Sequence, residues 1–94
     1  MKGCITVQEF MKQEDWGFGC NASVDLKVLV AALTKCGVSK VEVDVSYHRD
    51  PTYSDTLYVK LGKRMPTAAL CAIASQKPDE CSVDDKGWVR LWWD

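Results

Sequence analysis

The last seven residues of the chain, 88–94, place large side chains on both faces of one extended segment. Successive side chains of a β-strand point to opposite faces of the sheet. One face of this strand holds three apolar residues, Val89, Leu91 and Trp93. The other face holds an arginine between two tryptophans, which are Trp88, Arg90 and Trp92. Aromatic residues beside an arginine are typical of binding hot spots. If the aliphatic face is buried, we therefore expect the opposite face to be a contact surface.

Length and charge limit the classes of protein to which the chain can belong. With 94 residues, it can bury roughly two-thirds of its unfolded surface, so we expect residues 1–94 to form a single small globular domain. The formal net charge of -1 provides no general attraction for nucleic acid or for an anionic membrane. No apolar run approaches the length of a membrane span, so we expect no membrane partner.

The cysteines indicate a reducing compartment. There are five of them, an odd number, without a C-x-x-C pair: Cys4, Cys20, Cys36, Cys71 and Cys81. No apolar segment of a secretion signal follows Met1. We therefore expect free thiols and a cytoplasmic location.

Neither metal nor thiol chemistry has a convincing set of residues. The chain has one histidine and scattered cysteines, whereas a metal site needs three or four clustered ligands, so we expect no metal and no cofactor. Cys71 lies in an alanine-rich stretch, where we expect it to be buried as a small hydrophobic residue. Cys20 precedes a helix, whose dipole would favour a thiolate, and is the best candidate for a nucleophile.

Local signals in the first half predict two helices. Thr6 and Glu9 have the spacing of a capping box, which predicts a short helix from Val7; residues 3–6 could instead form a first strand. Residues 16–20 are rich in glycine and predict a turn or an irregular extended segment. Ser23 as N-cap and Asp25 in the first turn predict the second helix. Its apolar stripe consists of Leu26, Leu29, Val30 and Leu33. Gly37 should end this helix in a Schellman motif, with Val38 packed on Leu33.

Two alternating segments predict half-buried strands. In residues 40–48 the inward set is Val41, Val43, Val45 and Tyr47, and the outward set is Glu42, Asp44, Ser46 and His48. In residues 56–61 the inward set is Leu57, Val59 and Leu61, and the outward set is Thr56, Tyr58 and Lys60. We expect these strands to pair antiparallel across a loop at 49–55, with Lys60 facing Glu42 or Asp44.

The remaining signals complete an α+β fold. Residues 66–75 predict a helix with a proline near its first turn, and Pro78 follows it. Residues 81–83 and 88–93 predict a hairpin around the turn at 84–87. We expect an antiparallel sheet of about four strands with two or three helices on one face.

Two resemblances accompany this fold. The order of the elements resembles the ferredoxin-like split βαβ plan, with an N-terminal helix and a C-terminal hairpin added. That fold hosts many functions and decides little about this one. Residues 33–44 also resemble the helix-to-strand crossing of small heavy-metal-carrier domains. The paired cysteines of the metal loop in that family are missing here, so the resemblance does not imply metal binding.

The outer face of the predicted sheet carries the candidate binding residues. They are Tyr58, Lys60, Trp88, Arg90 and Trp92, with His48 at a strand end and Tyr53 in the loop. We expect a non-enzymatic protein-binding module that occupies a site on a larger partner. By its size and lack of catalytic motifs it is similar to the inhibitors of phages and other mobile elements, including anti-CRISPR and other anti-defence proteins.

Three alternatives to this interpretation stay open. The first is a single-stranded nucleic-acid binder that stacks bases on the aromatic residues, although Glu42 and Asp44 would repel phosphates. The second is a small thiol-dependent enzyme, or one whose site forms on oligomerisation, and a homodimer through the aromatic face is a related option. In the third, the tryptophans are covered by the hairpin or by the N-terminal segment.

Overall fold

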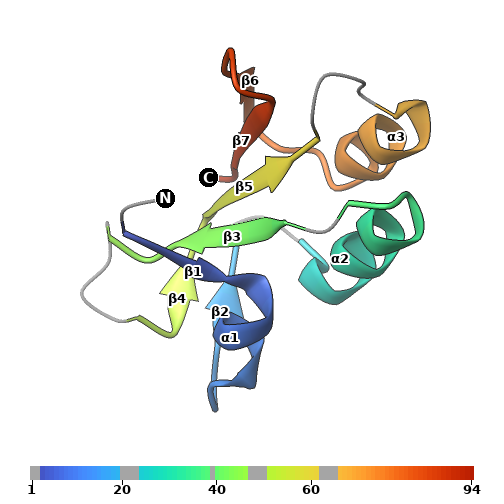
Figure 1. Ribbon diagram of the computed structural model, residues 1–94. Helices are drawn as coiled ribbons and strands as arrows, with labels where there is room; N and C mark the ends of the chain where they lie inside the picture. Colours follow the sequence, from blue (N-terminus) through green and yellow to red (C-terminus); the bar gives the residue numbers. More distant parts are fainter. Residues whose placement is uncertain (1–2, 20–23, 39, 47–50, 62–65) are drawn as a thin grey trace.

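The computed structural model describes residues 3–19, 24–38, 40–46, 51–61 and 66–94. Its main sheet has five strands, in the spatial order β1 (Cys4–Thr6), β3 (Val41–Asp44), β5 (Thr56–Lys60), β7 (Trp88–Trp92) and β6 (Glu80–Val83). The helices are α1 (Val7–Lys12), α2 (Leu26–Lys35) and α3 (Thr67–Ser75). Figure 1 shows α2 and α3 side by side on one side of this sheet. The predicted α+β class, an antiparallel sheet with helices on one face, is confirmed.

The topology differs from the split βαβ plan. In that plan the two strands that a helix connects run parallel and are separated by a third strand, whereas here β1 and β3, and likewise β5 and β7, are antiparallel neighbours. The similarity is therefore limited to the order of elements along the chain. No described helix has both the length and the apolar character that a membrane crossing requires.

The N-terminal segment forms both of the elements that its sequence allowed. Residues 4–6 form β1, and the chain turns directly into α1 at Val7. Thr6 ends the strand and caps the helix, because its hydroxyl accepts a hydrogen bond from the backbone N–H of Glu9 at 3.1 Å and donates to the Glu9 carboxylate. The capping interaction predicted from the T-x-x-E spacing is confirmed.

Helix α2 begins and ends through specific caps. Its N-cap is Asp25, whose carboxylate accepts from the backbone N–H of Val28 at 3.1 Å. The prediction that Asp25 lies inside the first turn is wrong, and Ser23 falls outside the described residues. At the other end Gly37 has φ +86°, and the N–H of Val38 donates to the carbonyl of Leu33 at 3.0 Å. This is the predicted Schellman ending.

The core lies between the helices and the inward face of the sheet. The strand residues in it are Val41, Val43, Leu57, Val59, Val89 and Leu91, and the helices add Val7, Phe10, Leu26, Leu29, Leu33, Ala69 and Ile73. Trp93 is fully buried, its ring centroid lies 5.4 Å from that of Phe18, and its indole N–H donates to the carbonyl of Gln76 at 2.8 Å. The predicted burial of Val89, Leu91 and Trp93 is confirmed.

A second, two-stranded sheet was not predicted. β2 (Gly17–Phe18) and β4 (Tyr53–Ser54) pair in parallel, so part of the expected glycine-rich turn and part of the 49–55 loop are strands. A Cβ at position 17 would lie 3.4 Å from the ring of Tyr53, which is an ordinary van der Waals contact. Ser54 is fully buried, and its hydroxyl donates to the carbonyl of Asp44.

Three side chains have a different environment from the predicted one. Asp44 and Thr56, expected to face solvent, are 6% and 1% exposed. The carboxylate of Asp44 accepts from the backbone N–H of Ser46 at 2.9 Å and from its hydroxyl, so local hydrogen bonds replace water. Cys71, expected to be buried, is exposed, because α3 buries only Ala69 and Ile73.

Candidate functional site

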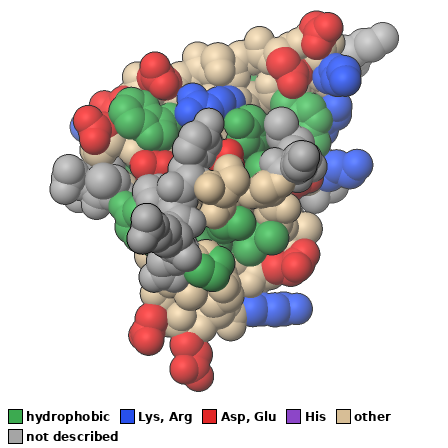
Figure 2. All heavy atoms as spheres, turned by 90° about the vertical axis from the view of Figure 1, so that its left-hand side faces the viewer, with side chains coloured by type: hydrophobic (Ala, Val, Ile, Leu, Met, Phe, Trp, Pro, Cys, Tyr) green, Lys and Arg blue, Asp and Glu red, His purple; other side chains and the backbone are tan. Residues whose placement is uncertain are grey.

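Strand register gathers the candidate residues on the face of the sheet that points away from the helices. One row across β3, β5, β7 and β6 consists of Glu42, Tyr58, Arg90 and Ser82. Lys60 and Trp88 are partners in the adjoining row on one side. The row on the other side consists of Thr56, Trp92 and Glu80. Figure 2 shows this face, where apolar, basic and acidic side chains are intermixed.

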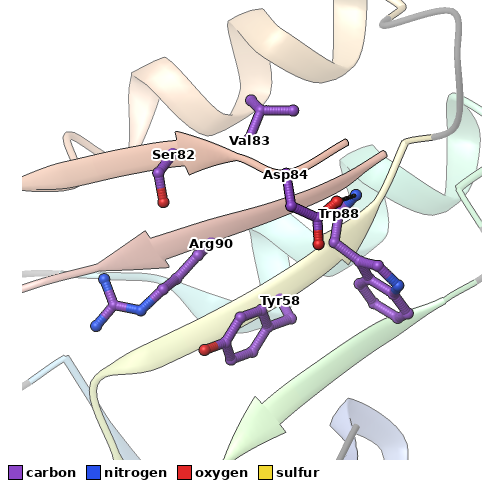
Figure 3. Close-up of a pocket in the computed structure, with 6 residues that line it drawn as sticks. All are labelled: Tyr58, Ser82, Val83, Asp84, Trp88 and Arg90. Carbon is purple, nitrogen blue, oxygen red and sulfur yellow. Dashed lines mark hydrogen bonds between the residues drawn. The ribbon is translucent and has the colours of Figure 1, made fainter. Parts of the chain in front are cut away.

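A shallow hollow of about 180 Å³ opens on this face, where the hairpin of β6 and β7 meets β5. It is lined by Tyr58, Ser82, Val83, Asp84, Trp88 and Arg90. In Figure 3 the rings of Tyr58 and Trp88 project from neighbouring strands, and Asp84 lies beside Trp88. Aromatic walls and a few polar groups in a concave site are what a protruding side chain of a partner requires.

Lys60 holds the outer edge of this hollow in place. Its ammonium group lies 5.3 Å from the centroid of the Trp88 ring, within the range of a cation–π interaction, and it donates a hydrogen bond to the backbone carbonyl of Lys86. The predicted pairing of Lys60 with Glu42 or Asp44 is wrong, because the register places Tyr58 opposite Glu42. Lys60 therefore orients Trp88 on the hairpin side of the sheet.

Asp84 fixes the turn that forms the rim of the hollow. Its carboxylate accepts from the backbone N–H groups of Lys86 at 2.8 Å and Trp88 at 3.0 Å. The hydrogen bond from Trp88 is the main cause that lowers the pKa of Asp84 below its ordinary value of 3.8, and the bond from Lys86 adds to it. The rim therefore carries a negative charge at neutral pH.

Arg90 connects the hollow with the edge strand. A guanidinium nitrogen lies 3.5 Å from a carboxylate oxygen of Glu80; Arg90 is half-buried and Glu80 is exposed. Burial raises the pKa of Tyr58, and the nearby guanidinium group of Arg90 partly offsets this rise. Arg90 thus lies between a carboxylate and a neutral phenol, which limits the orientations of its guanidinium group.

The structure brings together four of the seven predicted site residues and places two others, Trp92 and Tyr53, outside the hollow. Tyr58, Lys60, Trp88 and Arg90 surround one hollow. Trp92 is half-buried on the same face in an adjoining row. Tyr53 belongs instead to β4, in contact with Gly17, and His48 lies outside the described residues.

Sequence reasoning missed Ser82 and Asp84, which complete the hollow. A signal for both was present, because a hairpin with its turn at 84–87 places these residues next to the outward residues of the last strand. Neither residue is aromatic or basic, so neither has the side chain that is typical of a binding hot spot.

Neither thiol nor metal chemistry gains support from the described residues. Burial, reinforced by the charges of Asp44 and Glu42, raises the pKa of Cys4 to about 11, so its thiol stays protonated at neutral pH. Cys20 falls outside the described residues. Within the described ranges, no three His, Cys, Asp or Glu side chains gather as a metal site requires.

Comparison of the chain with protein-family models, with curated proteins and with solved structures found no match. The geometry of this face is therefore the basis for a functional proposal.

Proposed function

We propose that the protein is a non-enzymatic binding module that docks on a protein partner through the outer face of its sheet. The observation that carries this proposal is the hollow that Tyr58, Trp88 and Arg90 line together. Tryptophan, tyrosine and arginine are the residues that dominate the energy of protein interfaces when a partner covers them. Their clustering on an open face supports a docking surface.

The charges of this face favour a protein over a nucleic acid. The described cations beside the hollow are Lys60, Lys86 and Arg90, and Lys60 and Arg90 already have partners in the domain. Three carboxylates share the face with them, on Glu42, Glu80 and Asp84. A polyanion would meet as many negative as positive charges among the described residues of this face, whereas a protein surface of mixed charge can complement it.

Composition and size are the basis for the proposed location and biological role. The cysteine content is in keeping with a reducing cytosol, and we place the protein there. The larger partner could be a component of a defence system, as for inhibitors carried by phages, anti-CRISPR proteins among them. Small size is the support for this part of the proposal.

The test is affinity capture from a lysate of the cells that produce the protein, with and without nuclease. The wild type is compared with the double variant Trp88→Ala/Trp92→Ala and with Val28→Ala as a matched control. Val28 is 56% exposed on α2, on the helical side of the sheet. We expect a protein that survives nuclease and is captured by the wild type and by the control, but not by the double variant.

Other outcomes would contradict the proposal in different ways. Capture that disappears with nuclease and weakens steeply with salt would favour single-stranded nucleic acid. Equal capture by the folded double variant would move the interface away from this face. Circular dichroism of each variant provides the check that it is folded.

A further inference from the structure

We propose that β6 receives an extended, basic segment of the protein partner as an additional strand of the main sheet. This inference rests on the proposed function and specifies how and with which kind of segment the partner binds. It concerns the edge of the sheet beside the hollow, where Ser82, Val83 and Asp84 belong to both features.

The hydrogen bonds of the hairpin show which backbone groups of β6 point outward. The N–H of Asp84 donates to the carbonyl of Trp88, and the register pairs Ser82 with Arg90 and Val83 with Val89. Along an antiparallel pair, hydrogen-bonded and non-hydrogen-bonded positions alternate. Ser82 therefore bonds to β7, while the N–H and C=O groups of Cys81 and Val83 point away from it, toward the open edge.

The opposite side of β7 agrees with this alternation. The N–H of Leu61 donates to the carbonyl of Gly87, and the N–H of Trp93 donates to the carbonyl of Asp55. The odd-numbered residues of 87–93 thus make their backbone hydrogen bonds to the β5 side, and the even-numbered residues make theirs to β6. The outward direction of Cys81 and Val83 follows independently from both sides of the strand.

Within the described part of the chain, the edge at β6 carries acidic side chains but no lysine, proline or bulge to block strand addition. Natural edge strands are commonly blocked by lysine, proline, a bulge or a covering element. Residues 80–83 contain neither lysine nor proline, and their four consecutive pairs with β7 leave no bulge. All four residues are exposed, Val83 to 49%.

The edge at β1 is much less accessible to a partner strand. β1 has three residues, and Thr6 already begins the turn into α1. The same alternation leaves one outward position before that turn, Cys4, because the N–H of Val45 donates to the carbonyl of Gly3 on the β3 side. Of the two edges, β6 is therefore the one that can form a ladder of several hydrogen bonds.

Charge indicates the chemistry of the incoming segment. The side chains of Glu80, Ser82 and Asp84 alternate with those of Cys81 and Val83 and lie on the outer face of the sheet. Asp79 and Asp85 flank this segment in the sequence. Antiparallel pairing with a second copy that sets Cys81 opposite Val83 would also set Glu80 opposite Asp84 of that copy, and like charges directly opposite are destabilising. A segment with Lys or Arg at alternate positions avoids this repulsion, and its other side chains would lie beside Cys81 and Val83, which favours apolar residues there.

The test uses synthetic nine-residue peptides with blocked ends that alternate Lys with Val or Thr. The controls are the same peptide with Glu in place of Lys, and one N-methylated at the backbone positions facing β6. Binding is followed by NMR shifts and amide exchange of the full chain. We expect only the Lys peptide to bind and to slow amide exchange at Cys81 and Val83.

Val83→Pro removes an outward N–H and leaves the bonds of Ser82 and Asp84 to β7 in place. We expect this substitution to lower the affinity for the Lys peptide roughly five- to tenfold, as the loss of one hydrogen bond implies. Val83→Ala, which keeps the N–H, is the matched control and should retain amide protection at both edge positions. If Val83→Pro does not fold, Glu80→Lys replaces it and should shift the preference from the Lys peptide to the Glu peptide.

Several results would overturn the edge proposal. It fails if the Lys peptide does not bind, or if the Lys and Glu peptides bind equally well. It also fails if folded Val83→Pro binds the Lys peptide with unchanged affinity, or if the NMR shifts are confined to β1. If these appear while protein capture still depends on Trp88 and Trp92, the edge inference fails and the proposed function stands. If the Lys peptide binds but no protein is captured through Trp88 and Trp92, the proposed function fails instead.

Discussion

Replacing Trp93 by alanine should be among the most damaging single substitutions in this chain. Trp93 is fully buried, and its indole both packs on Phe18 and donates to the carbonyl of Gln76. Truncation of a buried Trp to Ala costs about 3–5 kcal/mol, and the aromatic pair contributes about 1 kcal/mol beyond its buried area. A domain of 94 residues has a total stability of roughly 5–14 kcal/mol.

The matched comparison is Trp92→Ala, one residue earlier on the opposite face of the strand. Trp92 is half-buried, so we expect a cost of about 1 kcal/mol, near the average for point substitutions. Trp93→Phe should lie between the two, because it keeps an apolar ring but loses the hydrogen bond to Gln76, worth about 1 kcal/mol.

Urea unfolding followed by far-UV circular dichroism measures all three variants without depending on tryptophan fluorescence. With a denaturant slope of about 1–3 kcal/mol per molar urea, Trp93→Ala should lower the midpoint by on the order of 2 M. Equal costs for Trp92→Ala and Trp93→Ala would refute the assignment of faces on which both the core and the binding surface depend.

Three further predictions concern the hairpin, the thiols and the end of the chain. The pKa of Asp84 is lowered in the folded state, so the ionised carboxylate stabilises the fold above the unfolded value of 3.8, and this stabilisation is lost as pH falls through the folded pKa. Asp84→Asn should therefore have a lower free energy of unfolding than the wild type at pH 7 and the same free energy at acid pH. A difference between the two proteins that does not change with pH would contradict this. At pH 8 a maleimide should modify exposed Cys71 and Cys81 before Cys4, whose pKa is raised to about 11, and mass spectrometry showing Cys4 modified first would remove that argument. Deletion of residues 88–94 removes Val89, Leu91 and Trp93 from the core and should abolish cooperative unfolding, because several large buried side chains contribute more than the whole stability; a folded truncation would disprove the role of β7.

Features that depend on periodicity or on caps could be predicted from the sequence. The period of two in residues 88–93 identified Val89, Leu91 and Trp93 as core residues, and the burial pattern agrees. The capping box at Thr6 and the Schellman ending at Gly37 each involve residues within a few positions of one another. Short-range geometry leaves few alternatives in such cases.

Features that depend on distant contacts could not be predicted in the same way. β2 and β4 are two residues long and pair in parallel across 36 positions of sequence, from Gly17 to Tyr53, with no periodic signal. Asp44 is buried because Ser46 turns back to hydrogen-bond it. Lys60 bonds to the carbonyl of Lys86 because the pairing of β5 with β7 brings it beside the hairpin turn.

The candidate site shows the same division. Its aromatic and basic members were recognisable as outward residues of two strands, and four of them surround the hollow. Their relative positions depend on the register that places Tyr58 beside Arg90 and Arg90 beside Ser82. A shift by one residue would turn every one of these side chains to the other face.

Site-specific photo-crosslinking would test the central proposal most directly. A photoreactive amino acid at position 82, inside the hollow, is compared with one at Lys27, exposed on α2 at the helical side of the sheet. In cells that produce the protein, we predict a nuclease-resistant protein adduct from position 82, lost with Trp88→Ala, and none from position 27. Adducts from position 27 alone, or adducts at position 82 that nuclease removes, would contradict a protein-binding face on this side of the sheet.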